Sequence, residues 1–115
     1  MIVDDSERFL EVARTGLHRN GLEVVGTATT SAEALERVKE LRPDVVLVDI
    51  SLGEESGFDL TRELAATPGV DARLVLISTR DEDDLIDLIA QSPAVGFIPK
   101  ARLSAAAVNE LLNGA

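Results

Sequence analysis

The stretch "VVLVDISLGEESG" (residues 45–57) decides the fold. Its first four residues, Val45 to Val48, are all apolar, with no alternation of polar and apolar side chains. This pattern is typical of a strand that is covered on both faces, as the strands of a parallel sheet are. The strand ends at Asp49, and in open parallel sheets ligands bind just outside the carboxyl ends of the strands. The stretch therefore predicts a buried parallel strand with a site at its end.

Strand-like and helical segments alternate along the whole chain. Short apolar, β-branched runs lie at 2–3, 22–28, 45–48, 74–77 and 95–98. Apolar residues at helical spacing indicate helices over 6–19, 30–42, 58–66, 81–90 and 103–112. Thr30 and Glu33 have the spacing of a capping box at the start of the second helix. This alternation predicts an α/β fold, a doubly wound parallel sheet with helices on both faces, in a single domain over residues 1–115.

Charge and composition narrow the classes of function. The 115 residues include 21 acidic and 11 basic side chains, so the net charge is −10 at pH 7. Such a field repels nucleic acid and anionic membranes, and it favours divalent cations or basic partner surfaces. There is no cysteine for disulfides, thiolate metal sites or nucleophilic catalysis. The sequence shows neither a membrane-length apolar run nor a signal peptide, and we expect a cytoplasmic protein.

Polar and charged residues follow four of the predicted strands. Asp4 and Asp5 follow the first strand, Asp49 the third, Ser78 the fourth and Lys100 the fifth. If these strands are neighbours, all five side chains meet at one edge of the sheet. Crowded carboxylates repel one another unless a cation joins them, and carboxylate oxygens suit Mg²⁺. A carboxylate beside Mg²⁺, a lysine and a hydroxyl is a site at which an aspartyl phosphate can form.

These residues and three others form an ordered set of motifs. The set is Asp4-Asp5, Asp49, Gly57 eight residues later, Ser78-Thr79, Phe97 and Lys100. In order and spacing it resembles the receiver domain of two-component response regulators, and the match covers essentially the whole chain. The stretches "LISTRDEDD" and "GFIPKARLS" are similar to receivers of the LuxR/NarL-type group. The resemblance implies a flavodoxin-like (βα)5 fold with strand order 2-1-3-4-5.

The resemblance also implies a metal site. Asp5 matches a direct Mg²⁺ ligand, and Asp4 matches a residue that holds the ion partly through water. Asp49 and the backbone carbonyl of Ser51 match the remaining protein ligands.

A phosphorylation switch is implied by the same match. Asp49 is the expected phosphoacceptor, Lys100 the lysine that senses the phosphoryl group, and Ser78 the hydroxyl that turns toward it. Phe97 is the expected aromatic switch residue. The implied donor is a histidine kinase or a phosphotransfer protein, and the implied output or homodimer surface is the face of helix four, strand five and helix five. A receiver of this kind is a phosphoacceptor rather than an enzyme acting on other substrates, and this segment is not expected to bind nucleic acid or membranes.

The loop after Asp49 departs from the family pattern. Gly53 stands where the family often has proline, and we expect it to loosen the loop. Glu54 and Glu55 follow, and they either are solvated loop residues or hinder the approach of the phosphodonor.

Two other functions are alternatives to the switch. The first is a pseudo-receiver, an interaction module that is never phosphorylated, against which the complete set of acids, serine and lysine argues. The second is a phosphatase of the haloacid dehalogenase type, which also uses an aspartyl nucleophile at a strand end. That family needs a second Asp two positions later, where this chain has Ser51, and we set it aside.

Overall fold

Five parallel strands form the central sheet, in the order β2-β1-β3-β6-β7. A computed structural model describes residues 1–114 of the protein. The strands are β1 (Ile2–Val3), β2 (Thr27–Ala28), β3 (Val45–Asp49), β6 (Arg73–Ser78) and β7 (Gly96–Pro99). Counted along the chain, these five strands have the order 2-1-3-4-5, so the expected doubly wound, flavodoxin-like topology is confirmed.

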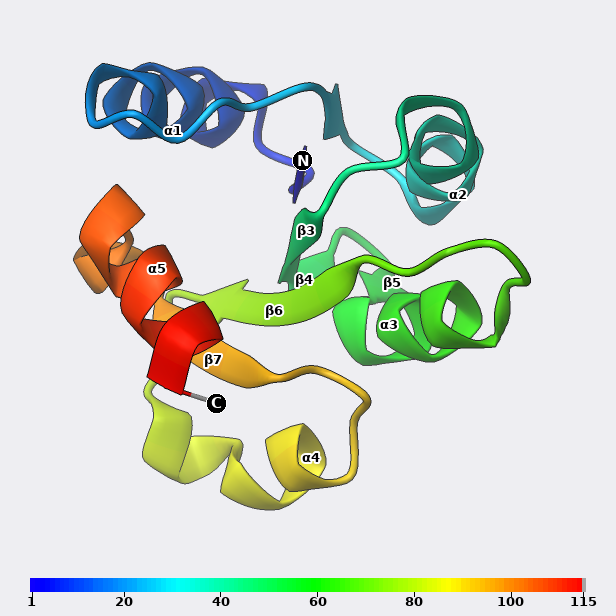
Figure 1. Ribbon diagram of the computed structural model, residues 1–115. Coiled ribbons are helices and arrows are strands. Elements are labelled where there is room, and N and C mark those ends of the chain that lie inside the picture. Colours follow the sequence, from blue (N-terminus) through cyan, green and yellow to red (C-terminus); the bar gives the residue numbers. More distant parts are fainter. Residues whose placement is uncertain (115) are drawn as a thin grey trace.

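Helices cover both faces of this sheet (Figure 1). Helices α1 (Glu7–Arg19) and α5 (Ala105–Gly114) pack on one face over a core that includes Leu47 and Val75. Helices α2 (Ser31–Leu41), α3 (Gly57–Ala66) and α4 (Ile86–Ala90) lie on the other. That second core includes Val48 and Leu76. These residues follow Leu47 and Val75 in the chain, and successive side chains of a strand point to opposite faces. Within the described residues no helix combines the length and apolarity needed to cross a membrane.

Thr30 caps the start of α2 as predicted, whereas the reciprocal bond of the expected capping box goes to the residue before the cap. Thr30 Oγ1 accepts a hydrogen bond from the backbone N–H of Glu33 at 3.2 Å. Glu33 Oε1 in turn accepts from the N–H of Thr29 at 3.1 Å, one residue before the cap. The helix ends at Leu41, and its C-cap, Arg42, adopts a left-handed conformation with φ 47° directly before Pro43.

Two predicted elements differ from the structure. The strand expected over 22–28 is reduced to Thr27–Ala28, because its only neighbour, β1, offers two residues for pairing. The helix expected over 81–90 is a 3₁₀ turn, η1 (Glu82–Asp84), followed by the short α4. Leu85 separates the two with φ −124° and ψ 3°, and its side chain is buried. Asp81 supplies no side-chain cap, so a continuous helix is not favoured there.

An antiparallel hairpin, which the sequence analysis did not anticipate, lies between β3 and α3. Its strands are β4 (Ser51–Leu52) and β5 (Glu55–Ser56), joined by a two-residue turn at Gly53 and Glu54. Gly53 has φ 63°, a conformation that suits glycine at the first position of such a turn. Proline could not occupy this position because its ring fixes φ near about −65°. The expected loosening of the loop by Gly53 is therefore wrong: glycine here permits an ordered turn.

Gly57, the first residue of α3, packs directly against the backbone of β3. Its N–H donates to the Ile50 carbonyl at 2.7 Å. A Cβ added at this position would overlap the Asp49 carbonyl oxygen and also crowd the Asp49 carbonyl carbon and Ile50 Cα. The absence of a side chain at Gly57 therefore allows the helix to begin beside the end of the strand.

We expect Gly57→Ala to destabilise the fold by about 1–3 kcal/mol, because backbone atoms that cannot rotate away must shift. Gly16→Ala is the matched control. Gly16 lies on the exposed side of α1 with no atom in the way, and alanine there should stabilise the helix by about 0.5–1 kcal/mol. Urea unfolding followed by circular dichroism measures both changes. Equal stability of Gly57→Ala and the wild type would contradict the proposed close packing.

Candidate functional site

The sheet register places two buried carboxylates side by side. Val3 of β1 pairs with Val48 of β3, so the next residues, Asp4 and Asp49, stand next to each other at the carboxyl edge. The Asp4 side chain is 0% exposed and the residue Asp49 is 5% exposed. The edge predicted from the strand ends is therefore where these two acids meet.

Asp5 completes an acidic cluster with this pair. One carboxylate oxygen from each of Asp4, Asp5 and Asp49 lies within 4.8 Å of the other two, and Asp5 is the exposed member. Backbone N–H groups hold the buried pair: Ser6 donates to Asp4 Oδ1 at 2.8 Å, and Ser51 donates to Asp49 Oδ1 at 3.2 Å. One carboxylate oxygen of each buried acid is thereby fixed, and the other contacts the Lys100 ammonium.

Lys100 supplies the positive charge of the site. Its Nζ lies 2.5 Å from Asp4 Oδ2 and 3.1 Å from Asp49 Oδ2, and it donates a hydrogen bond to the latter. It also lies 4.4 Å from the centroid of the Phe9 ring. Phe9 is a contact that the sequence analysis missed, since helical spacing showed only that it belonged to the apolar side of α1. An aromatic face beside an ammonium group stabilises its charge.

Burial and neighbouring charges shift the pKa values of Asp49 and Lys100. Burial raises the pKa of Asp49 above its ordinary value of 3.8, and the nearby Asp4 charge raises it further, although Lys100 opposes both effects. Burial alone would lower the pKa of Lys100, but its contacts with Asp4 and Asp49 outweigh burial, and the net shift is upward. Lys100 is therefore charged at neutral pH, while a negative charge on Asp49 is disfavoured in the cluster as it stands.

The donor set fits a hard divalent cation. Asp4 Oδ2 is buried, and within the described part of the chain its close polar contact is the ion pair with Lys100. Three carboxylates face one lysine, so the cluster has an excess of negative charge and free oxygen lone pairs. Mg²⁺ prefers such oxygens and keeps several of its waters, which the exposed position of Asp5 allows.

Ser78 and Phe97, the predicted switch residues, lie in different places. Ser78 ends β6, one residue beyond the Ile77 that pairs with Asp49, so it reaches the same edge. Its buried hydroxyl accepts a hydrogen bond from the Arg80 N–H at 3.0 Å. Phe97 is paired with Leu76 below this edge and is buried in the core on the α2–α3–α4 face.

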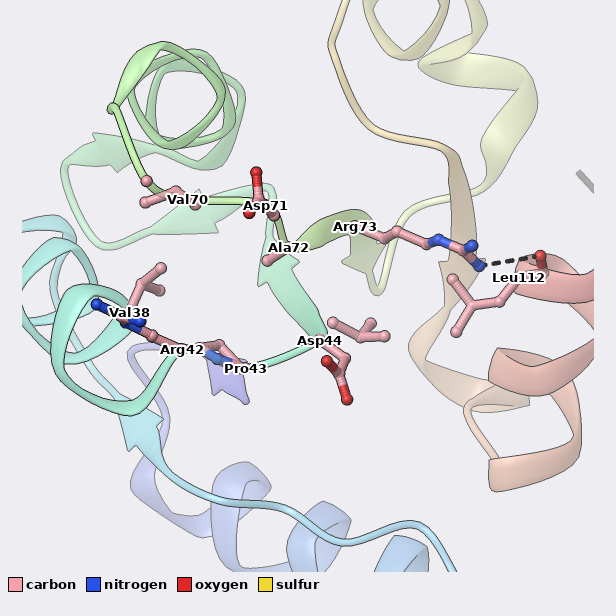
Figure 2. Close-up of a pocket in the computed structure, with 11 residues that line it drawn as sticks. Val38, Arg42, Pro43, Asp44, Val70, Asp71, Ala72, Arg73 and Leu112 are labelled. Atoms are coloured by element: carbon pink, nitrogen blue, oxygen red, sulfur yellow. Dashed lines mark hydrogen bonds between the residues drawn. The ribbon is translucent and has the colours of Figure 1, made fainter.

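A cavity of about 510 Å³ lies at the opposite edge of the sheet, beside the amino ends of β3 and β6 (Figure 2). Arg42, Asp44, Asp71 and Arg73 line it, and their charged groups point away from one another. The Arg73 guanidinium donates to the Leu112 carbonyl of α5 at 3.3 Å. This cavity gathers no cluster of reactive groups comparable to the acidic edge.

Comparison with known proteins agrees with the geometry. The sequence model of the family described as "Response regulator receiver domain" matches residues 1–111. This chain belongs to the response regulator receiver family. It is 33% identical over 105 residues to the response regulator GacA of Pseudomonas viridiflava, a match that covers 87% of this chain and 47% of GacA. The chain thus spans about half the length of the GacA relatives it matches.

Shorter relatives match the receiver along nearly their whole length. Chemotaxis protein CheY of Bacillus subtilis is 32% identical over 116 residues, covering 98% of this chain and 96% of CheY. The solved receiver domain of the putative response regulator NarL from Mycobacterium tuberculosis has 30% identity and a TM-score of 0.85. That alignment covers 99% of this chain and 94% of the NarL chain. The flavodoxin-like fold of this receiver is therefore supported by sequence and by structure.

The electrostatics of the receiver predict that Asp49→Asn stabilises the metal-free protein. Because the folded state raises the pKa of Asp49, folding disfavours its charged form, and the wild type loses stability relative to the variant as the pH rises above 3.8. We expect the thermal midpoint of Asp49→Asn to exceed that of the wild type at pH 7 in EDTA, with a smaller difference at pH 4.

Mg²⁺ should reduce or reverse this advantage by stabilising the wild type preferentially. Differential scanning calorimetry in EDTA and in Mg²⁺ makes both comparisons. A destabilised Asp49→Asn in EDTA at pH 7 would contradict the electrostatic account.

Proposed function

We propose that this receiver accepts a phosphoryl group on Asp49 from a histidine kinase or a phosphotransfer protein. The observation that carries the proposal is the Lys100 ammonium held between the buried carboxylates of Asp4 and Asp49. A carboxylate nucleophile and a fixed cation at the open edge of a parallel sheet are suited to phosphoryl transfer, which depends mainly on positioning and charge stabilisation.

In the proposed reaction a carboxylate oxygen of Asp49 attacks the phosphorus of a phosphohistidine. A P–O bond forms to Asp49 as the P–N bond breaks, and the electron pair of that bond returns to the imidazole. Lys100, 3.1 Å from Asp49 Oδ2, is placed to bind the negative oxygens of the transferred group. A Mg²⁺ ion held by Asp4, Asp5, Asp49 and the Ser51 carbonyl would neutralise further charge on that group. Hydrolysis of the acyl phosphate would return Asp49 to its starting state.

The proposed output surface lies on α4, β7 and α5. Ile86 and Leu88 of α4 and Val95 before β7 are 58%, 46% and 42% exposed, so three of the exposed large apolar side chains lie on this part of the chain. The Ser78 hydroxyl, which accepts from the Arg80 N–H, would turn to donate its O–H to the phosphoryl group, and Phe97 is buried in the core on the α4 side. We propose that phosphorylation changes the affinity of this surface for a partner, including a second copy of the chain.

Phosphorylation can be tested with a small phosphodonor. Incubated with acetyl phosphate and Mg²⁺, the wild type should gain one phosphoryl group by intact mass, and Asp49→Asn should gain none. Lys100→Ala should be phosphorylated at least about tenfold more slowly, since phosphoryl transfer depends largely on charge stabilisation and Lys100 is the cation in contact with Asp49. Lys39→Ala is its control, because Lys39 is exposed on α2.

Two results would contradict the phosphoacceptor role. Modification of Asp49→Asn would place the phosphoryl group elsewhere. A wild type that binds Mg²⁺ but remains unmodified by acetyl phosphate and by purified histidine kinases would favour the phosphorylation-independent interaction module.

The output surface can be tested by sedimentation velocity with beryllium trifluoride, which mimics the phosphoryl group on a carboxylate. We expect association of the wild type to increase with the mimic. Ile86→Asp should abolish this increase, because it places a charge in the apolar surface. Val12→Asp on α1, a residue 66% exposed, should leave it unchanged. Equal association of both variants would exclude the α4 surface from self-association.

A further inference from the structure

Glu55, which the sequence analysis interpreted as solvated or obstructive, joins the β4–β5 hairpin to α2. Its Oε1 accepts a hydrogen bond at 3.0 Å from the backbone N–H of Ser31, 24 residues away in the chain. Ser31 is the first residue of α2, where N–H groups have no acceptor within the helix. A carboxylate at this end of a helix also interacts favourably with the helix dipole.

The same hairpin borders the acidic cluster. Ser51, on β4, donates its N–H to Asp49 Oδ1 at 3.2 Å. At the turn, a Cβ built on Gly53 would lie 3.8 Å from Asp5 Oδ2, so the turn backbone is next to that carboxylate. The hairpin therefore contacts two of the three acids of the cluster.

The ends of the hairpin are held by other contacts, since Gly57 N–H donates to the Ile50 carbonyl and the Ser56 hydroxyl caps α3. Each strand has two residues, with Ser51 paired to Ser56 and Leu52 paired to Glu55. So short a ribbon has little stability of its own in water. Leu52 is buried and anchors β4, whereas Glu55 and Glu54 are exposed. On the β5 strand, the bond from Glu55 to Ser31 is the contact that fastens the ribbon to α2.

We propose that Glu55 is a positioning residue for the acidic edge. By accepting the Ser31 N–H, Glu55 fixes the β4–β5 hairpin against α2, and this holds Ser51 and the turn at Gly53 in place beside Asp49 and Asp5. A cation can then bind at the cluster without first ordering the loop. The expected effect of Glu55 on Mg²⁺ affinity rests on the proposed Mg²⁺ site, whereas its expected effect on the hairpin does not.

The hydrogen bond can be removed from either side, which separates it from the charge of Glu55. Glu55→Ala removes both the acceptor and the charge. Ser31→Pro removes only the donor, at a first helical position where proline is well tolerated, and Thr30 before it is already extended. Glu54→Ala removes the same charge from the adjacent position, and among the described residues no side-chain hydrogen bond is lost with it. Glu55→Gln keeps an acceptor oxygen without the charge.

Two measurements on these variants test the inference. Without metal, amide hydrogen exchange by NMR should be faster in residues 51–56 of Glu55→Ala and Ser31→Pro than in the wild type or Glu54→Ala. In Mg²⁺ titrations both variants that lose the bond should bind about two- to fivefold more weakly, the range expected for a charged acceptor at a helix end. Glu55→Gln should resemble Glu54→Ala. The double variant Glu55→Ala/Ser31→Pro should be no weaker than Glu55→Ala, because both changes remove one bond.

Each contrary outcome is distinct. If Ser31→Pro left both exchange and Mg²⁺ affinity unchanged while Glu55→Ala and Glu54→Ala weakened Mg²⁺ equally, Glu55 would act through charge alone and the inference would be overturned. If the wild type bound no Mg²⁺, the proposed metal site would fail, and the exchange rates would still decide whether Glu55 holds the hairpin.

Discussion

The ion pairs of Lys100 with Asp4 and Asp49 are the interaction on which the arrangement of this protein depends. Two carboxylates have been withdrawn from water side by side, and each would be costly to bury without a counter-charge. The lysine that provides it follows β7, which is separated from β3 by β6. The sheet order and the register of its edge strand therefore determine whether the acidic edge can exist at all. Pro99 suits this edge, because a strand paired on one side needs fewer N–H donors.

The strands that were predicted correctly are those whose local sequence alone indicates a buried strand. The unbroken apolar runs around Val46 and Leu76 identified β3 and β6 without any neighbour, and the strand-end rule then grouped the acids with Lys100. The contact of Phe9 with Lys100 was not predictable in this way, because it joins segments about ninety residues apart whose orientations follow only from packing. The break at Leu85 was not predictable either, because the apolar spacing of this segment is that of a continuous helix, whereas the structure has a 3₁₀ turn before Leu85.

The segment after Asp49 shows why a departure from a family pattern needs a structure for its interpretation. Considered alone, Gly53 in place of proline suggested a flexible loop. Glu54 and Glu55 suggested either solvated residues or an obstacle to the phosphodonor. In the folded chain Gly53 turns a hairpin, and one of the two acids satisfies the start of a helix. Gly53 and Glu55 thus both favour the same hairpin conformation, which proline at position 53 would not permit.

Helix α4 is short, and none of its residues from Ile86 to Ala90 is fully buried. Leu85 before it is buried, and Ile89 packs only partly against the core. Segments with so few buried contacts open locally at a small fraction of the free energy of global unfolding. In the proposed switch, a hydrogen bond gained by Ser78 would contribute about 1 kcal/mol, which is small against the packing of β3 or β6. Among the described helices, the one on the proposed output surface without a buried residue is α4, which therefore contributes least to the core.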